Sequence, residues 1–152
     1  MIRTFQTHEV RKQEELTEHL WEFEPCQGQF AGKKYQVATP CCWESLPDFS
    51  GYRGEGVYRR TFVAGGNIRM EFKGVSHTAT VYLDGMEITH HYNAYTAFSV
   101  ILHDIKEGEH LLEIKADNRF SEESALHIPN DYMSYGGVSR PVVLEHLGEI
   151  YI

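Results

Sequence analysis

Hydrogen-bonding and aromatic side chains gather in one segment near the end of the chain, residues 124–140. Its sequence, SALHIPNDYMSYGGVSR, places Asn130 and Asp131 beside Tyr132, with Tyr135 close behind. The segment is long for a connection in a compact domain, and long loops tend to carry binding residues. Tyrosine faces can stack on the CH faces of a sugar ring while Asp and Asn hold its hydroxyls. An ordered loop packed by its own tyrosines explains the same composition equally well.

The cysteines and histidines do not have the spacing of a metal site. Structural zinc needs four Cys or His ligands at short, regular spacings, whereas Cys26 stands alone and Cys41 and Cys42 are adjacent. His90 and His91 are adjacent as well, and neighbouring residues of a strand point to opposite faces. We therefore expect no metal site. Three cysteines, two of them adjacent, also make a poor disulfide framework, which favours a reducing compartment.

Other kinds of active site lack their signatures. A phosphate-binding glycine loop leads into a helix N-terminus, but the run GYRGEG precedes a strand-like segment and is read as a turn. The sequence has no G-x-S-x-G to hold a serine nucleophile. Glu122 and Glu123 lie in the polar run RFSEES and are read as a solvated loop, because acidic residues are too plentiful here for a pair to indicate glycoside hydrolysis. We expect no catalytic residue in this chain.

Composition and charge restrict the class of protein. A chain of 152 residues, 41% hydrophobic and 24% charged, is typical of a single globular domain, which we place at residues 1–152. Its formal net charge of -8 disfavours nucleic acid as a partner. Its apolar runs fall short of the ~20 residues that cross a bilayer, and the start MIRTFQTHEVRKQ lacks the apolar core of a secretion signal. We expect a cytoplasmic protein without membrane contacts.

The hydrophobic pattern has a period of two along much of the chain. In NIRMEFKGV, Ile68, Met70 and Phe72 alternate with charged residues, and HLLEIKAD repeats the pattern. Such alternation predicts half-buried antiparallel strands. An Asp84-Gly85 pair between two β-prone runs predicts a tight hairpin in which residues 80–83 pair with residues 87–90.

Glycines divide the sequence into short strand-like runs, and helix signals are few. Gly65-Gly66 and Gly108 are among these dividers, and only EELTEHL could form a turn or two of helix. About eight or nine short strands predict a two-layer sandwich of antiparallel sheets. The last strand should span residues 142–147. The apolar ending Ile150-Tyr151-Ile152 is the pattern expected of a cut at a domain boundary.

Four motifs in the same order and similar spacing carry a family resemblance. The runs PCCWES, YRGEGVYRR, FKGVSHTATVYLDGMEITHHYNAYTAF and NDYMSYGGVSRPV resemble the N-terminal sugar-binding domain of glycoside hydrolase family 2, above all in its β-glucuronidases. The family also includes β-galactosidases and β-mannosidases. The resemblance covers residues 21–144. It implies an all-β fold, the galactose-binding-like jelly-roll β-sandwich of antiparallel sheets, which agrees with the period of two.

The resemblance also implies a longer parent protein. In this family an immunoglobulin-like sandwich and then a (β/α)₈ barrel follow, and the barrel carries the two catalytic glutamates. A barrel takes about 250 residues, with about 200 as a floor, so this chain has no room for one. The isolated chain should therefore be inactive, with the catalytic barrel of the same parent chain as its partner. The parent could also be a homo-oligomer, and no cofactor is implied.

The same resemblance implies the site residues. The family's loop before the Y-G-G-[IV]-x-R signature contributes an aspartate that hydrogen-bonds hydroxyls of the bound sugar, and Asp131 stands at the matching place, five residues before Gly136. Tyr135 is the second candidate for substrate binding, although packing also explains it, and Arg140 is read as a loop anchor. The remaining matches are read as core or turn residues: Trp43, Gly54, Tyr58, Arg60, His77, Tyr95 and Phe98.

Three hypotheses for function follow. The first is a non-catalytic domain that packs on the barrel of a retaining β-galactosidase or β-glucuronidase and helps to shape the subsite for a terminal β-glycoside. The second is a freestanding carbohydrate-binding module, since the same sandwich serves many lectin-like domains. The third is a domain that serves assembly alone. The sequence leaves the sugar open, because barrel residues make most of that choice.

Overall fold

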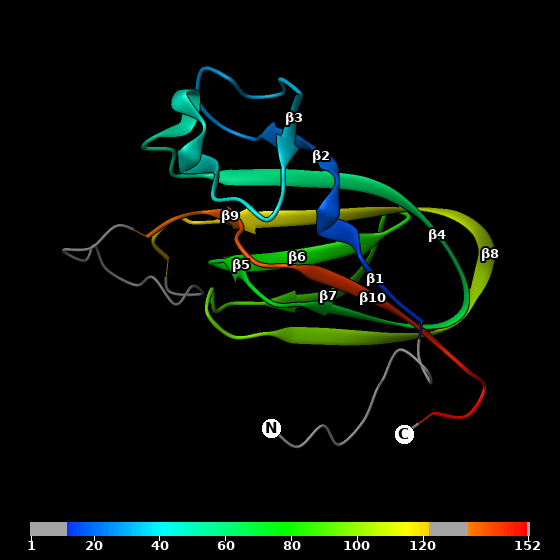
Figure 1. Cartoon of the computed structure of the whole chain (residues 1–152). Helices are drawn as coiled ribbons and strands as arrows, with labels where there is room; N and C mark the ends of the chain where they lie inside the picture. Colours follow the sequence, from blue (N-terminus) through cyan, green and yellow to red (C-terminus); the bar gives the residue numbers. More distant parts are fainter. Residues whose placement is uncertain (1–11, 122–133, 152) are drawn as a thin grey trace, which may run out of the picture.

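The computed structural model describes residues 12–121 and 134–151, and these form an antiparallel β-structure (Figure 1). The only helical elements in these ranges are the three-residue 3-10 turns η2 (Leu16–Glu18), η3 (Trp43–Ser45) and η4 (Pro47–Phe49). The strands are β1 (Lys12–Glu15), β2 (Leu20–Pro25), β3 (Tyr35–Ala38), β4 (Glu55–Phe72), β5 (Val75–Ser76), β6 (Thr78–Leu83), β7 (Met86–His91), β8 (Phe98–Asp117), β9 (Gly137–Val138) and β10 (Val142–Leu147). The predicted all-β sandwich and its last strand are confirmed.

Two long strands, β4 and β8, run through both layers of the sandwich. In one layer the order is β3, β2, the first half of β4, the second half of β8, β6 and β7. In the other it is β1, β10, the second half of β4 and the first half of β8. The pairing of β4 with β8 shifts register between Ala64 and Ile68, where both strands bend (Figure 1). The prediction that Gly65-Gly66 and Gly108 separate short strands was wrong, because irregular pairing at these residues bends one strand instead of ending it.

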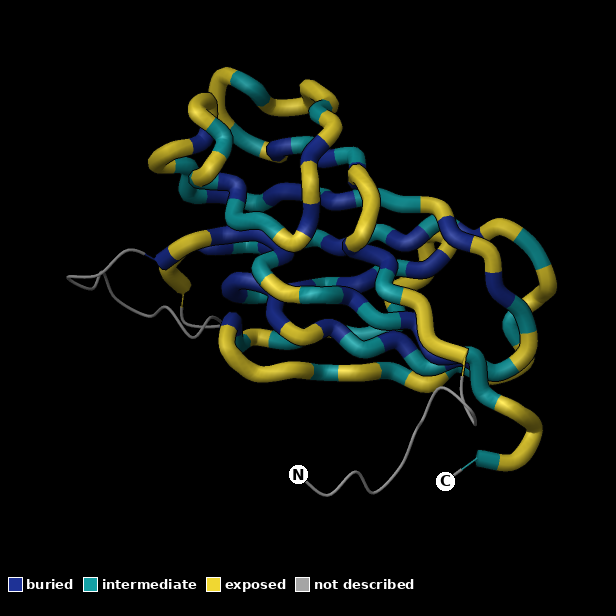
Figure 2. Tube along the Cα trace, viewed as in Figure 1, coloured by how far each residue is buried: buried dark blue, intermediate teal, exposed yellow. Residues whose placement is uncertain are grey.

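The core lies between the two layers. The apolar side chains that alternate with charged ones in the sequence point into it, as predicted. Ile68, Met70 and Phe72 of β4 are fully buried, while Arg69 and Glu71 between them are half-buried. Leu112, Ile114 and Ala116 of β8 are buried in the same way (Figure 2). The strands therefore determine which side chains point into the core.

An aromatic cluster fills the end of the sandwich where β2, β3 and the 3-10 turns meet. The ring of Phe23 lies 4.8 Å from that of Tyr58, 5.3 Å from that of Phe49 and 5.9 Å from that of Trp43, between ring centroids. Tyr35 adds an edge-on contact to Phe49 at 5.2 Å. Such pairs contribute about 0.5–1.5 kcal/mol each beyond their buried area, so the cluster gives η3 a rigid base.

The hairpin between β6 and β7 forms at the predicted turn. Thr80 pairs with His90 and Leu83 with Met86, with one irregularity after Val81. Asp84 and Gly85 have φ values of 49° and 82°, which a two-residue hairpin turn of this kind requires. Across the turn, the Asp84 carboxylate accepts the backbone N–H of Leu111 at 2.8 Å and contacts Nδ1 of His110 at 2.7 Å. The turn is thus tied to the corner of β8.

The hydrogen-bonded pair of His110 and Asp84 should make the free energy of unfolding depend on pH. The hydrogen bond to Asp84 raises the pKa of His110, and the same bond lowers the pKa of Asp84. A raised histidine pKa means that its stabilisation is complete below about pH 6.5 and is lost as the pH rises through the folded-state pKa. His110→Gln should therefore cost more stability at pH 5.5, where His110 is charged, than at pH 8.5, where it is neutral. Because half of Asp84 is exposed to solvent, we expect a cost of only about 1 kcal/mol at pH 5.5.

Urea denaturation of both proteins at the two pH values measures this difference. His90→Gln, a change at an exposed position of the same hairpin, is the matched control and should leave stability unchanged at either pH. An equal loss for His110→Gln at pH 5.5 and pH 8.5 would show that the pair does not carry the pH dependence.

No helix in the described part of the chain is long and apolar enough to cross a membrane.

Candidate functional site

The candidate site lies at the end of the sandwich where residues 134–141 lead into β10. We call these residues the strap. Asp131 lies outside the described residues, so its predicted role stays a prediction. Tyr135 lies in the strap, and half of its side chain is exposed. Its ring is not packed into the core, so the structure does not favour the packing interpretation for this tyrosine.

The strap is held against η3 and the residue two positions before it by backbone hydrogen bonds, and its two glycines allow the close approach. The backbone N–H of Trp43 donates to the carbonyl of Gly136 at 3.0 Å, and that of Cys41 to the carbonyl of Val138 at 2.7 Å. A Cβ at Gly136 would overlap the indole ring of Trp43, and Gly137 has a φ of 107°. Only glycine allows so close an approach of backbone to ring. The Y-G-G pattern therefore serves to dock the strap on Trp43.

Glu44 completes this contact. Its carboxylate accepts the N–H of Gly136, with both oxygens 3.0 Å from the nitrogen. Burial raises the pKa of Glu44, although the hydrogen bond from Gly136 opposes the shift. A half-buried carboxylate held in this way fixes the backbone next to Tyr135.

Asn118 connects the contact between Glu44 and Gly136 to the turn before β4. Its side chain is fully buried, and its Oδ1 accepts the N–H of Gly54 at 2.9 Å. Its Nδ2 donates to the carbonyl of Tyr52 at 3.0 Å and to Glu44 at 3.2 Å. Residues 51–54 of the GYRGEG run form a turn, as predicted, and the last two residues begin β4. The Asn118 amide ties this turn to Glu44, which in turn holds the strap. Sequence reasoning missed both Glu44, in η3, and Asn118, just after β8, because a polar residue in a turn or at a strand end has no periodic signal.

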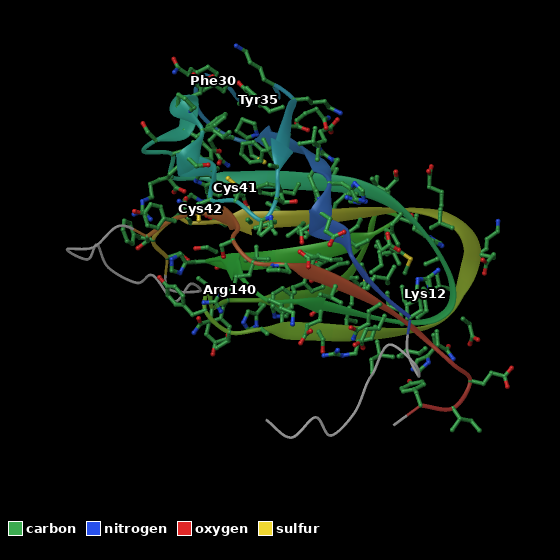
Figure 3. The ribbon with its side chains drawn as sticks, in the orientation of Figure 1. Lys12, Phe30, Tyr35, Cys41, Cys42 and Arg140 are labelled. Carbon is green, nitrogen blue, oxygen red and sulfur yellow. The ribbon has the colours of Figure 1, made fainter. Side chains whose placement is uncertain are left out.

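A second loop, residues 92–97 between β7 and β8, reaches the same end. Arg140 donates from Nη1 to the carbonyl of Tyr95 at 3.3 Å, and the N–H of Tyr95 donates to Oδ1 of Asn93 at 2.9 Å. Figure 3 shows Arg140 and Cys42 at this end of the sandwich. The role of Arg140 as a loop anchor is confirmed. Tyr95 is a turn residue as predicted, but its ring is exposed and does not belong to the core.

A small hollow of about 90 Å³ opens between the strap and this loop. It is lined by Cys42, Ser76, Ala94, Tyr95, Tyr135 and Ser139. The hydroxyl of Ser76 donates to the carbonyl of Tyr135 and so holds the backbone at the rim of the hollow. Burial raises the pKa of the Cys42 thiol, with Glu44 as a further cause, so this cysteine is a neutral thiol at neutral pH.

His77 lies behind Tyr95, with its ring at 90° to the tyrosine and 6.0 Å between centroids. It is buried, as predicted, and neither ring nitrogen has a hydrogen-bond partner among the residues that the structure describes. Burial lowers the pKa of His77, and the charge of Arg53 adds to the shift. A neutral imidazole in this place supports the Tyr95 ring.

The described residues bring together no group of three or more His, Cys, Asp or Glu side chains that could hold a metal ion. Cys26, Cys41 and Cys42 are free thiols. His91 lies against Phe98, with ring centroids 4.5 Å apart, while His90 is exposed, which confirms that these two histidines are a packed and a surface side chain. Glu122 and Glu123 lie outside the described residues.

No family model matches the sequence. The chain is 57% identical to the GH2 β-galacturonidase from Eisenbergiella tayi solved with bound galacturonate, with a TM-score of 0.89, and the match covers 98% of this chain and 27% of that one. A candidate β-glucuronidase from Formosa agariphila is 31% identical over 76% of this chain, and a β-galactosidase from Thermoanaerobacterium thermosulfurigenes is 29% identical over 81%.

The matched region spans 16% of the length of each of the latter two relatives. These relatives are thus several times longer than this chain. The four motifs, the all-β sandwich and these similarities show together that the chain belongs to glycoside hydrolase family 2.

Proposed function

We propose that residues 1–152 are a single non-catalytic domain of a family 2 β-glycosidase, which packs on the catalytic barrel of the same parent protein and shapes the sugar subsite. The observation that carries this proposal is the 57% identity over 98% of the chain to one part of a β-galacturonidase. Three free cysteines fit a cytoplasmic parent, because a reducing compartment keeps thiols unpaired.

The proposed reaction of the parent is hydrolysis of a terminal β-uronide with retention. In that reaction one carboxylate of the barrel forms a covalent glycosyl-enzyme intermediate and the other acts as acid and then base. This domain supplies no catalytic group. Its contribution is the rigid strap, which carries Tyr135 at the rim and leads from the segment that contains Asp131, the residue we propose for the hydroxyls of the bound sugar.

Hydrolysis assays of the whole parent protein test the proposal. We expect turnover of 4-nitrophenyl β-D-galacturonide to exceed that of the matching glucuronide and galactoside, and no turnover by the isolated 152-residue chain. Hydrolysis by the isolated chain would refute the assignment of a non-catalytic domain. If the parent cleaves none of the three glycosides, its assignment as a β-glycosidase of these sugars is wrong.

Replacing Asp131 should weaken the reaction without affecting the fold. Losing a charged hydrogen bond costs about 1.5–3 kcal/mol, so Asp131→Ala should lower kcat/KM of the parent roughly 13- to 160-fold. Asp48→Ala removes an exposed carboxylate from η4 and is the matched control. Both variants should unfold at the urea concentration of the wild type. Unchanged kcat/KM for Asp131→Ala would leave this residue with a structural role only.

The second candidate is a freestanding carbohydrate-binding module, and the exposed tyrosines around the hollow favour it. Calorimetric titration of the isolated chain with galacturonate, glucuronate and galactose distinguishes the two candidates. Heat of binding at millimolar sugar would support the module. We expect no measurable heat, since a hollow of about 90 Å³ is smaller than the roughly 300–1,000 Å³ of a complete ligand site.

A further inference from the structure

The exposed aromatic side chains of the described residues gather at one end of the sandwich. Tyr92 and Tyr95 are 61% and 62% exposed, Tyr135 is 52% exposed and Phe120 is 37% exposed, whereas the other large apolar side chains with this exposure are aliphatic. Figure 1 shows the loop after β7 and the strap at the same end. Exposed aromatic groups concentrated in this way mark a binding surface.

Two of these tyrosines are held in place by hydrogen bonds to their backbones while more than half of each side chain stays exposed. Ser76 binds the carbonyl of Tyr135, and Arg140 binds the carbonyl of Tyr95. Arg140 is itself fixed, because its N–H donates to the carbonyl of Gly74 at 3.2 Å. Both tyrosines line the hollow. A rim that is ordered before binding loses little conformational entropy when a ligand stacks on it.

The shape of the hollow suits one part of a glycoside better than the other. A sugar undergoing cleavage must be enclosed, because the charge of its transition state is stabilised by groups held in fixed positions around it. The leaving group has the opposite requirement. In a retaining reaction it departs while the sugar remains covalently attached, so its subsite must be open and must hold it weakly. The hollow is small, and the two tyrosines beside it are 62% and 52% exposed, so a group held there stays largely in contact with solvent, which meets the second requirement.

We propose that Tyr95 and Tyr135 form the leaving-group subsite of the parent enzyme, in which their rings stack on the ring of the departing alcohol. This inference rests on the proposed function, because the barrel must place the scissile bond beside the strap. Ser139 also lines the hollow, and its hydroxyl, which donates to the carbonyl of Gly74 at 3.3 Å, can accept a hydrogen bond from the departing alcohol. Arg140 acts as a positioning residue that couples the strap to the loop of Tyr95.

Two substrates that share a sugar but differ in leaving group test the subsite. For the sugar that the parent hydrolyses, the 4-nitrophenyl glycoside presents a ring to the tyrosines, and the 2,2,2-trifluoroethyl glycoside does not. Aromatic contacts contribute about 0.5–1.5 kcal/mol, so Tyr95→Ala and Tyr135→Ala should each lower kcat/KM for the 4-nitrophenyl substrate by roughly 2- to 13-fold. For the trifluoroethyl substrate kcat/KM should stay within a factor of two.

Two controls separate stacking from other roles. Tyr95→Phe and Tyr135→Phe keep the ring and should retain the wild-type ratio between substrates. Tyr92→Ala removes an equally exposed tyrosine that does not line the hollow, and should leave both substrates unchanged. Equal losses on both substrates would overturn the leaving-group assignment and place the tyrosines elsewhere in catalysis. A wild-type parent that hydrolyses neither substrate would instead refute the proposed function itself.

Discussion

Gly136→Ala should lower the free energy of unfolding of this chain by about 3 kcal/mol, the upper part of the range for overpacked cores. The added methyl group would occupy the space of the Trp43 ring. That ring cannot easily move, because it is 1% exposed and lies edge-on against Tyr52 at 5.3 Å, with Phe23 on another side at 5.9 Å. The strap would have to lift away from η3, and Tyr135 would move with it.

Urea denaturation followed by tryptophan fluorescence measures the effect. Gly51→Ala is the matched control, because a Cβ there meets nothing within 4 Å and its φ is ordinary. It should change stability by less than about 0.5 kcal/mol. If Gly136→Ala were as stable as the control, the close docking of the strap on Trp43 would be wrong.

Asn118→Asp should have a similarly large effect at pH 7, about 3 kcal/mol. The change keeps the oxygen that accepts Gly54 but replaces the amide donor with a second oxygen, which then faces the carbonyl of Tyr52 and the carboxylate of Glu44. Burial and the adjacent Glu44 should raise the pKa of the new carboxyl group. The folded state then binds a proton more tightly than the unfolded state, so the loss should shrink as the pH falls from 7 to 5.

Asn93→Asp supplies the control for this experiment. Asn93 also accepts a backbone N–H through Oδ1, from Tyr95 at 2.9 Å, and its side chain is less buried than that of Asn118. The same chemical change there should cost less than about 1 kcal/mol and show little dependence on pH. An Asn118→Asp loss that stays constant from pH 7 to pH 5 would show that Glu44 and residue 118 do not interact as the structure indicates.

Local patterns in the sequence predicted the strands well. Alternation identified the core faces of β4 and β8, the Asp84-Gly85 pair identified the β6–β7 hairpin, and β10 has the predicted bounds. Each of these signals is contained within a few neighbouring residues, because side chains alternate along a strand and a two-residue turn sets its own register. The family motifs added Arg140 as an anchor and Tyr135 as a candidate at the site.

The tertiary structure decided what these elements form together. Whether glycines such as Gly66 end a strand or bend it depends on its partner, and here the continuous pairing of β4 with β8 bends both strands through two layers. Tyr95 and Tyr135 are 40 positions apart in the sequence and share one hollow only because that bend brings their loops to the same end. The sequence patterns did not predict the roles of Glu44 and Asn118 either. Their hydrogen bonds join distant segments, and such a bond leaves no periodic pattern in either segment.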